Sequence, residues 1–138
     1  MTALVVRIGA LTLSATLETE RAPRTCAAFL ARLPFESQLV QARWSGESGW
    51  VPLGDYDLGV DHENATSHPA AGQVLWHPPG LSEAELLVPY GATRFASKVG
   101  QLAGNHFLTI HDEHGALAVL GRTLMYEGAQ RIRFEVAG

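Results

Sequence analysis

Apolar residues alternate with polar ones at both ends of the chain, and this period of two constrains the fold more than any other feature. Near the N-terminus every second residue is apolar on each side of Gly9-Ala10, over residues 4–8 and 11–17. Residues 132–136 show the same alternation near the C-terminus. Successive side chains of a β-strand point to opposite faces, so this pattern predicts strands with one buried face. We therefore expect an opening β-hairpin that turns at Gly9-Ala10, and a closing strand at the other end of the chain.

One segment has the period of a helix instead. Starting at Cys26, apolar residues stand at positions i, i+3, i+4 and i+7, which lie on one face of a helix. Pro23 suits the first position of that helix, and Pro34 ends the segment. Because Cys26 belongs to the apolar face, we expect a buried and unreactive thiol there.

The remaining short apolar segments predict further strands, separated by turns rich in glycine, proline and aspartate. The expected strands are residues 39–44, 50–53, 73–77, 85–90, 106–111 and 117–120, with turns at Ser45–Gly49, Pro78-Pro79-Gly80 and Asp112–Gly115. Asp57–Ala71 is polar without periodicity, which predicts a long surface loop. About eight strands with one or two short helices predict a mainly β fold, a closed antiparallel eight-stranded barrel. The length of 138 residues suits a single domain over 1–138.

Charge and size argue against several kinds of partner. The net charge of −4 is not that of a nucleic-acid-binding protein, which usually carries a basic stripe. The longest apolar runs are far shorter than the roughly 20 residues that cross a membrane. Arg7 and Gly9 interrupt the N-terminal apolar run, which makes a poor signal peptide. Cys26 is the single cysteine, so no internal disulfide can form and a cytoplasmic location is expected.

The six histidines raise the question of a metal site, but their spacing argues against one. On one strand His106 and His111 are separated by an odd number of positions, so we expect them on opposite faces. The sequence contains no HExxH motif and no paired cysteines. It also lacks a phosphate-binding loop, a dinucleotide fingerprint and a GxSxG motif. We therefore expect neither a metal nor a cofactor.

Residues 90–110 combine three glycines with polar side chains and predict a shaped binding surface. Arg94 is a candidate for holding a carboxylate through two parallel hydrogen bonds, with Asn105 and His106 adding directional ones. Tyr90 and Phe107 supply aromatic surface beside them. The alternative is that Arg94 is only solvated and that Asn105 is only a turn residue.

Arg43-Trp44 is the second candidate for function. A guanidinium next to an indole can bind a carbonyl or a carboxylate. The alternative is a surface ion pair between Arg43 and Glu47, with Trp44 packed in the core.

The order of these segments resembles that of the cyclophilins. The similar segments are the opening hairpin, APRTCAAFLARL at residues 22–33, QARW at 41–44, AGNHFLTI at 103–110 and AVLGR at 118–122, the last being similar to the penultimate cyclophilin strand. Residues 72–80 and 90–110 resemble more closely an uncharacterised bacterial family with a cyclophilin-like fold. The resemblance implies a cyclophilin-like β-barrel.

Cyclophilins are peptidyl-prolyl isomerases, and the resemblance places Arg43 where the family has its catalytic arginine. Other positions depart from the family pattern. His106 stands where the family has a glutamine, Leu108 replaces the phenylalanine that packs on proline, and Asp112 aligns roughly with its tryptophan. A proline ring needs an apolar, aromatic-lined slot, and much of that slot is lost here.

Taken together, the sequence predicts a non-catalytic protein that binds a small anionic or amide-bearing metabolite, or a peptide, in a pocket on the barrel. The expected ligand-binding residues are Arg43, Trp44, Tyr90, Arg94, Asn105, His106 and Phe107. One alternative is a weak prolyl isomerase that uses Arg43. The other is a regulatory or structural subunit of a metabolic enzyme that acts through apolar residues such as Trp50 or Leu81, and homo-oligomerisation is a further expectation.

Overall fold

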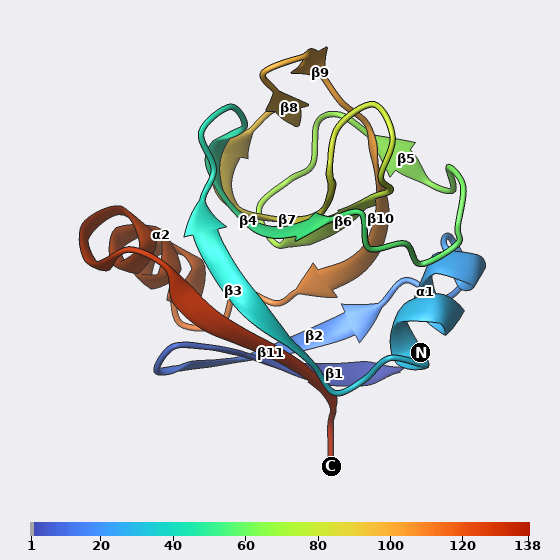
Figure 1. Cartoon of the computed structure of the whole chain (residues 1–138). Helices are drawn as coiled ribbons and strands as arrows, with labels where there is room; N and C mark the ends of the chain where they lie inside the picture. The colour runs from blue at the N-terminus through green and yellow to red at the C-terminus, as the bar shows by residue number, and fades with distance from the viewer. Residues whose placement is uncertain (1) are drawn as a thin grey trace.

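Eight antiparallel strands close into a barrel in the computed structural model, which describes residues 2–138 (Figure 1). They are β1 (Ala3–Ile8), β2 (Leu11–Leu17), β3 (Phe35–Gln41), β4 (Gly46–Gly54), β6 (Gln73–His77), β7 (Ala84–Thr93), β10 (Gly104–Ile110) and β11 (Gln130–Val136). Around the barrel the strands follow the order β2-β1-β11-β3-β4-β7-β6-β10, and pairing of β10 with β2 closes the circle. The predicted mainly β fold, with a closed eight-stranded barrel, is confirmed.

Three short strands and two helices complete the chain. Strand β5 (Ala65–Thr66) pairs with the start of β10, and β8 (Ala96–Ser97) pairs with β9 (Gly100–Gln101) in a separate hairpin. The helices are α1 (Pro23–Leu30) and α2 (Ala116–Glu127). In Figure 1 the helices lie on opposite sides of the barrel, and the β8–β9 hairpin projects beyond it. No helix within residues 2–138 is long and apolar enough to cross a membrane.

The alternating pattern at the chain ends forms the predicted strands. In β1, Val6 pairs with Leu13 of β2 on one side and with Phe134 of β11 on the other. All three side chains are buried in the barrel core. The two ends of the chain therefore lie side by side in the sheet, and the hairpin turns at Gly9, whose φ of 56° suits glycine.

Helix α1 closes one end of the barrel with an aromatic contact. The ring of Phe29 lies 5.0 Å from that of Phe107 and 5.2 Å from that of Phe134, both edge to face. Such pairs contribute about 0.5–1.5 kcal/mol each beyond the area they bury. Cys26 is buried on the same face, as predicted, and its thiol donates to the carbonyl oxygen of Phe107 at 3.2 Å. Burial raises the pKa of this thiol to about 12, so it stays protonated and unreactive.

The predicted strand at residues 117–120 is wrong, because this segment is part of helix α2. The four apolar residues match a strand or a helix equally well, but Leu117, Leu120 and Leu124 are all buried and follow the helical period. Gly121 lies so close to β7 that a Cβ there would be 2.5 Å from the ring of Tyr90. The similarity of residues 118–122 to a penultimate cyclophilin strand is therefore wrong as well.

The strand boundaries near residue 45 also differ from the prediction. Strand β3 ends at Gln41 rather than Trp44, and β4 already begins at Gly46, so the turn occupies residues 42–45. The expected turn at Ser45–Gly49 lies mostly within β4 because Gly49 packs against β3, where an added Cβ would be 2.9 Å from Leu39. The predicted loop at Asp57–Ala71 is largely confirmed, although it contains β5 and buries Leu58.

A second, smaller apolar cluster lies outside the barrel. In β6 and β7, Val74, Trp76, Leu86 and Val88 belong to the barrel core. The side chains between them point outward because strand residues alternate. Two of them, Leu75 and Leu87, form a cluster with Phe95 and Leu102 from the segment that follows β7, and Trp50 packs against this cluster. The segment that carries the β8–β9 hairpin covers this outer face, and the candidate site lies at its edge.

Candidate functional site

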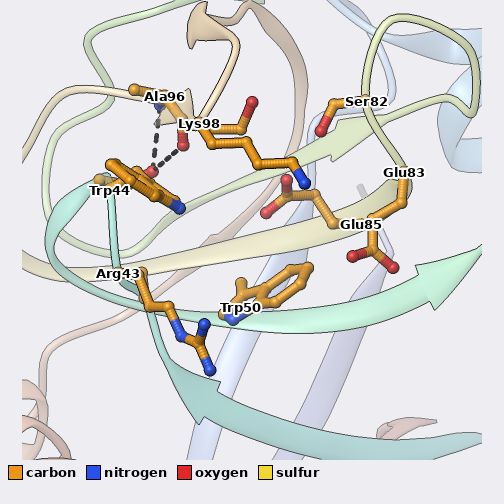
Figure 2. A pocket seen from close by; sticks show the side chains of 11 residues that line it. Arg43, Trp44, Trp50, Ser82, Glu83, Glu85, Ala96 and Lys98 are labelled. Atoms are coloured by element: carbon orange, nitrogen blue, oxygen red, sulfur yellow. Dashed lines mark hydrogen bonds between the residues drawn. The ribbon is translucent and has the colours of Figure 1, made fainter.

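A cavity of about 290 Å³ opens on the outer face of the barrel, where β4 and β7 pass beneath the turn at 42–45 and the β8–β9 hairpin (Figure 2). Its lining combines two indoles with charges of both signs. The lining residues are Ala42, Arg43, Trp44, Ser45, Trp50, Ser82, Glu83, Glu85, Ala96, Ser97 and Lys98.

Strand register places Glu85 and Trp50 in the floor of this cavity. Trp50 of β4 lies directly opposite Leu87 of β7, and Glu85 is two residues from Leu87. The three side chains therefore share the outer face of the sheet. Leu87 is covered by the outer apolar cluster, whereas Glu85 and Trp50 border the cavity.

Ser45 fixes one wall of the cavity to the other. Its hydroxyl donates to the carbonyl oxygen of Ala96 at 2.9 Å and accepts from the N–H of Ala96 at 3.1 Å (Figure 2). Ser45 is itself buried. The turn that carries Arg43 and Trp44 is thus held against the hairpin that carries Lys98, so the cavity has a defined shape before any ligand arrives.

Glu85 is the unusual group of this site. Its side chain is buried, with only 5% of the residue exposed. No side-chain hydrogen bond or ion pair among residues 2–138 involves its carboxylate. Burial, reinforced by the negative charge of Glu83, raises the pKa of Glu85 to about 8. The carboxyl group is therefore largely protonated at neutral pH.

The positive charges of the cavity lie at its rim. Arg43 and Lys98 are both exposed and come from opposite sides of the opening. In Figure 2 the side chain of Lys98 extends across the opening toward Glu85, while Arg43 extends past Trp50. Among residues 2–138 no ion pair joins either cation to a carboxylate. Both are free to meet an anionic group of a ligand.

Two of the predicted site residues, Arg43 and Trp44, line this cavity. The alternative that Trp44 packs in the core is wrong, because 59% of the residue is exposed. The alternative ion pair between Arg43 and Glu47 is not formed, and one oxygen of Glu47 instead accepts the N–H of Ala92 at 2.8 Å. Whether Arg43 and Trp44 bind a ligand stays a prediction.

Asn105 and Phe107 lie away from the cavity and make structural contacts. The amide of Asn105, only 1% exposed, donates to the carbonyl oxygen of Asp61 at 2.9 Å and to the hydroxyl of Thr25 at 3.1 Å. Its oxygen accepts the N–H of Glu63 at 3.0 Å. Asn105 thereby ties the 57–64 loop and α1 to the barrel, and Phe107 is fully buried in the core.

Tyr90 and Arg94 are also separate from this cavity. Tyr90 lies in a groove beside α2, and its hydroxyl donates to the side-chain oxygen of Gln41 at 2.8 Å. Arg94 is exposed, and its backbone N–H donates to the carbonyl oxygen of Ser45 at 3.3 Å. The structure therefore does not bring the seven predicted residues into one cavity.

His106 and His111 lie on the same face, so the expectation of opposite faces is wrong. A ring nitrogen of His106 lies 2.8 Å from the hydroxyl of Thr109, and one of His111 lies 2.7 Å from that of Thr16. Thr109 and Thr16 are direct cross-strand partners. A register shift between His106 and Leu108 adds a residue and reverses the alternation. Burial lowers the pKa of His106, and no group of three potential metal ligands occurs within residues 2–138.

Sequence reasoning missed Glu85, Trp50 and Lys98 as neighbours of Arg43. Glu85 gave a signal, since it is the one charged residue of the otherwise apolar run at 84–88. A lone charge in a strand buried on both faces marks a special environment. The convergence of Lys98 and Arg43 depends on how the hairpin folds back, and no local pattern carries that information.

Over residues 4–136 the sequence matches a family described as "Protein of unknown function (DUF3830)". The chain belongs to this family. No curated protein sequence matches this DUF3830 protein.

Two solved structures share the fold of the DUF3830 protein. One is described as the structure of McbB in complex with tryptophan, with a TM-score of 0.72 and 18% sequence identity. The match covers 98% of the DUF3830 chain but only 45% of McbB, so the chain spans less than half the length of McbB. The other is the hypothetical protein AF2241 from Archaeoglobus fulgidus, with a TM-score of 0.59 and 22% identity over 99% of this chain and 95% of that one. At these identities the likeness concerns the fold.

Proposed function

We propose that this DUF3830 protein binds a small anionic or amide-bearing metabolite in the cavity floored by Trp50 and Glu85, without catalysing a reaction. The observation that carries the proposal is the convergence of two indoles with Arg43 and Lys98 around one preformed opening. Ligand sites typically combine apolar and aromatic walls with a few polar groups that fix orientation. The volume of about 290 Å³ suits a small metabolite.

The polar groups of the rim favour an anion or an amide. Arg43 and Lys98 can bind a carboxylate, and the hydroxyl of Ser82 can exchange hydrogen bonds with an amide. McbB shares the fold and was solved with tryptophan. This likeness makes L-tryptophan a reasonable first probe, and its indole matches the aromatic walls formed by Trp44 and Trp50.

Isothermal titration calorimetry with L-tryptophan tests the proposal. Arg43→Ala should weaken binding about 10- to 100-fold, because a hydrogen bond to a charged group contributes about 1.5–3 kcal/mol. The matched control is Arg122→Ala, which removes an exposed arginine from α2, beside the other groove. Equal affinities of the wild type and the Arg43→Ala variant would remove Arg43 from the site.

A weak prolyl isomerase is the second candidate, as the resemblance to cyclophilins implies. The supporting observation is that Arg43 lines the same cavity as Trp50, so a guanidinium and an aromatic wall could flank a prolyl bond. An isomerase assay on Ala-Pro peptides separates the two candidates. If both the wild type and the Arg43→Ala variant isomerise the peptides only at the background rate, prolyl isomerase activity is excluded.

A regulatory subunit, or a homo-oligomer, is the third candidate. Of the two residues expected at such a contact, Leu81 in the β6–β7 connection is 73% exposed, whereas Trp50 is partly buried against the outer apolar cluster. Tyr126 of α2 is 85% exposed. Exposed apolar side chains are frequent in contacts between proteins. Light scattering of the purified protein at several concentrations tests self-association, and a constant monomeric mass contradicts it.

In all three proposals residues 1–138 act as one cyclophilin-like domain of a bacterial, cytoplasmic protein.

A further inference from the structure

A buried carboxyl group without a partner needs a physical explanation. Glu85 is 95% buried and borders the cavity, yet its oxygens receive no side-chain hydrogen bond from residues 2–138. Desolvation of such a group costs free energy that an apolar side chain in the same place would not incur. Packing alone therefore does not explain a glutamate at this position.

No group around Glu85 neutralises it. His77 of β6 lies directly opposite Glu85, but burial lowers the pKa of His77 and keeps the imidazole neutral. Glu83, on the connection before β7, adds a second negative charge. From the facing elements come Arg43 of the turn at 42–45 and Lys98 of the hairpin, both exposed and neither in an ion pair with Glu85. Lys98 extends toward Glu85 (Figure 2) but forms no ion pair with it, so within residues 2–138 the carboxylate has no cation bound and can pair with one from a ligand.

The walls next to Glu85 also suit a cation. Trp50 and Trp44 both line the cavity (Figure 2). Tryptophan has the most favourable aromatic face for a cation, with an attraction of about 0.5–2 kcal/mol. A protonated amine that enters the cavity therefore finds a carboxylate below it and indoles beside it.

We propose that Glu85 binds the protonated amine of the ligand, while Arg43 and Lys98 bind its anionic group. The ligand class is then a zwitterion, an amino acid or a similar small molecule with an amine and an acid on one aromatic or apolar body. This inference rests on the proposed function, because it assigns the ligand class of the same cavity.

Binding of an amine should release a proton. Below the raised pKa of about 8 the free protein holds a proton on Glu85, and an ion pair with the ligand's ammonium requires the carboxylate. The proton leaves Glu85 for the buffer, while the amine keeps its own. Amine binding at pH 7 should therefore release close to one proton and tighten as the pH rises toward 8.

Three probes with the same indole ring separate the charges: tryptamine with the amine only, indole-3-propionate with the acid only, and L-tryptophan with both. Calorimetry at pH 7 in phosphate and in Tris, which differ in ionisation enthalpy, measures affinity and proton release together. We expect L-tryptophan to bind most tightly. Glu85→Gln should weaken tryptamine at least tenfold, leave indole-3-propionate nearly unchanged and abolish the proton release.

Glu127→Gln is the matched control, since it removes an exposed carboxylate at the end of α2 that does not line the cavity. It should change tryptamine affinity less than threefold, and thermal unfolding confirms that each variant is folded. If indole-3-propionate binds as tightly as L-tryptophan and Glu85→Gln changes neither, the amine inference is overturned while the proposed binding function stands. If none of the three probes binds the wild type, both the amine inference and the proposed binding function are contradicted for indole ligands.

Discussion

Replacing Glu85 by glutamine should remove a specific pH dependence from the stability of this protein. The pKa of Glu85 is about 8 in the folded chain, against an ordinary value near 4.5 that the unfolded chain should show. Between these two values the folded state holds a proton that the unfolded state has lost. The free energy of unfolding therefore falls as the pH rises through this window, and the loss is complete above pH 8.

The size of this effect follows from the difference between the two pKa values. Each pH unit corresponds to about 1.4 kcal/mol, which sets an upper limit near 5 kcal/mol. Water that enters the open cavity stabilises the charged form and reduces the penalty, so we expect about 2–4 kcal/mol. Glutamine is a neutral isostere of the protonated carboxyl, and it should fold as the wild type does at low pH.

Urea unfolding of the wild type and Glu85→Gln between pH 4.5 and pH 9 measures this difference. The two free energies should agree near pH 4.5, and the variant should be more stable by about 2–4 kcal/mol at pH 9. Taking the difference between the two proteins cancels the contribution of other titrating groups. Parallel curves over the whole range would show that Glu85 ionises normally, and would refute the reasoning from burial.

Three further changes test other contacts. Gly121→Ala places a Cβ 2.5 Å from the ring of Tyr90. Overpacking costs about 1–3 kcal/mol and should exceed the gain in helix propensity of about 1 kcal/mol, so the melting temperature should fall. A higher melting temperature would show that the ring moves freely. Asn105→Ala removes three hydrogen bonds and leaves the N–H of Glu63 without its acceptor. Urea unfolding should therefore show that the free energy of unfolding falls by about 2–4 kcal/mol. A decrease below 1 kcal/mol contradicts the structural role of Asn105. Lys98→Met should weaken indole-3-propionate about fivefold in calorimetry and strengthen tryptamine, because the charge of Lys98 attracts one probe and repels the other; equal shifts for both would exclude an electrostatic role.

Much of the fold could be predicted because its determinants are local. The alternation over residues 4–17 specifies a hairpin with one buried face, and Pro23 marks the start of α1 at the residue where the structure has it. The prediction failed at residues 117–120, where four apolar residues are too few to distinguish a period of two from one of 3.6. It also failed at His106, because a β-bulge changes the face of every residue beyond it and leaves no clear mark in the sequence.

The candidate site was predictable only in part. Arg43 and Trp44 stood out for their chemistry, a guanidinium next to an indole, and for the resemblance that places Arg43 where cyclophilins have their catalytic arginine. Asn105 looked like a binding residue for a sound reason, since it is polar and follows glycine, but its hydrogen bonds are all internal. The approach of Lys98 to Glu85 follows from the hydroxyl of Ser45 holding two loops together, about fifty residues apart in the sequence. Such a contact depends on the whole barrel.

The central claim is that the cavity beside Trp44 and Trp50 is the ligand site, and the indole N–H signals of the three tryptophans test it directly. Trp76 is fully buried in the barrel core and serves as the internal reference. In ¹⁵N-labelled protein titrated with L-tryptophan, the signals of Trp44 and Trp50 should shift and saturate together, while that of Trp76 stays in place. Indole signals that all remain unchanged, or backbone N–H shifts confined to the groove of Tyr90 and Gly121, would contradict the claim.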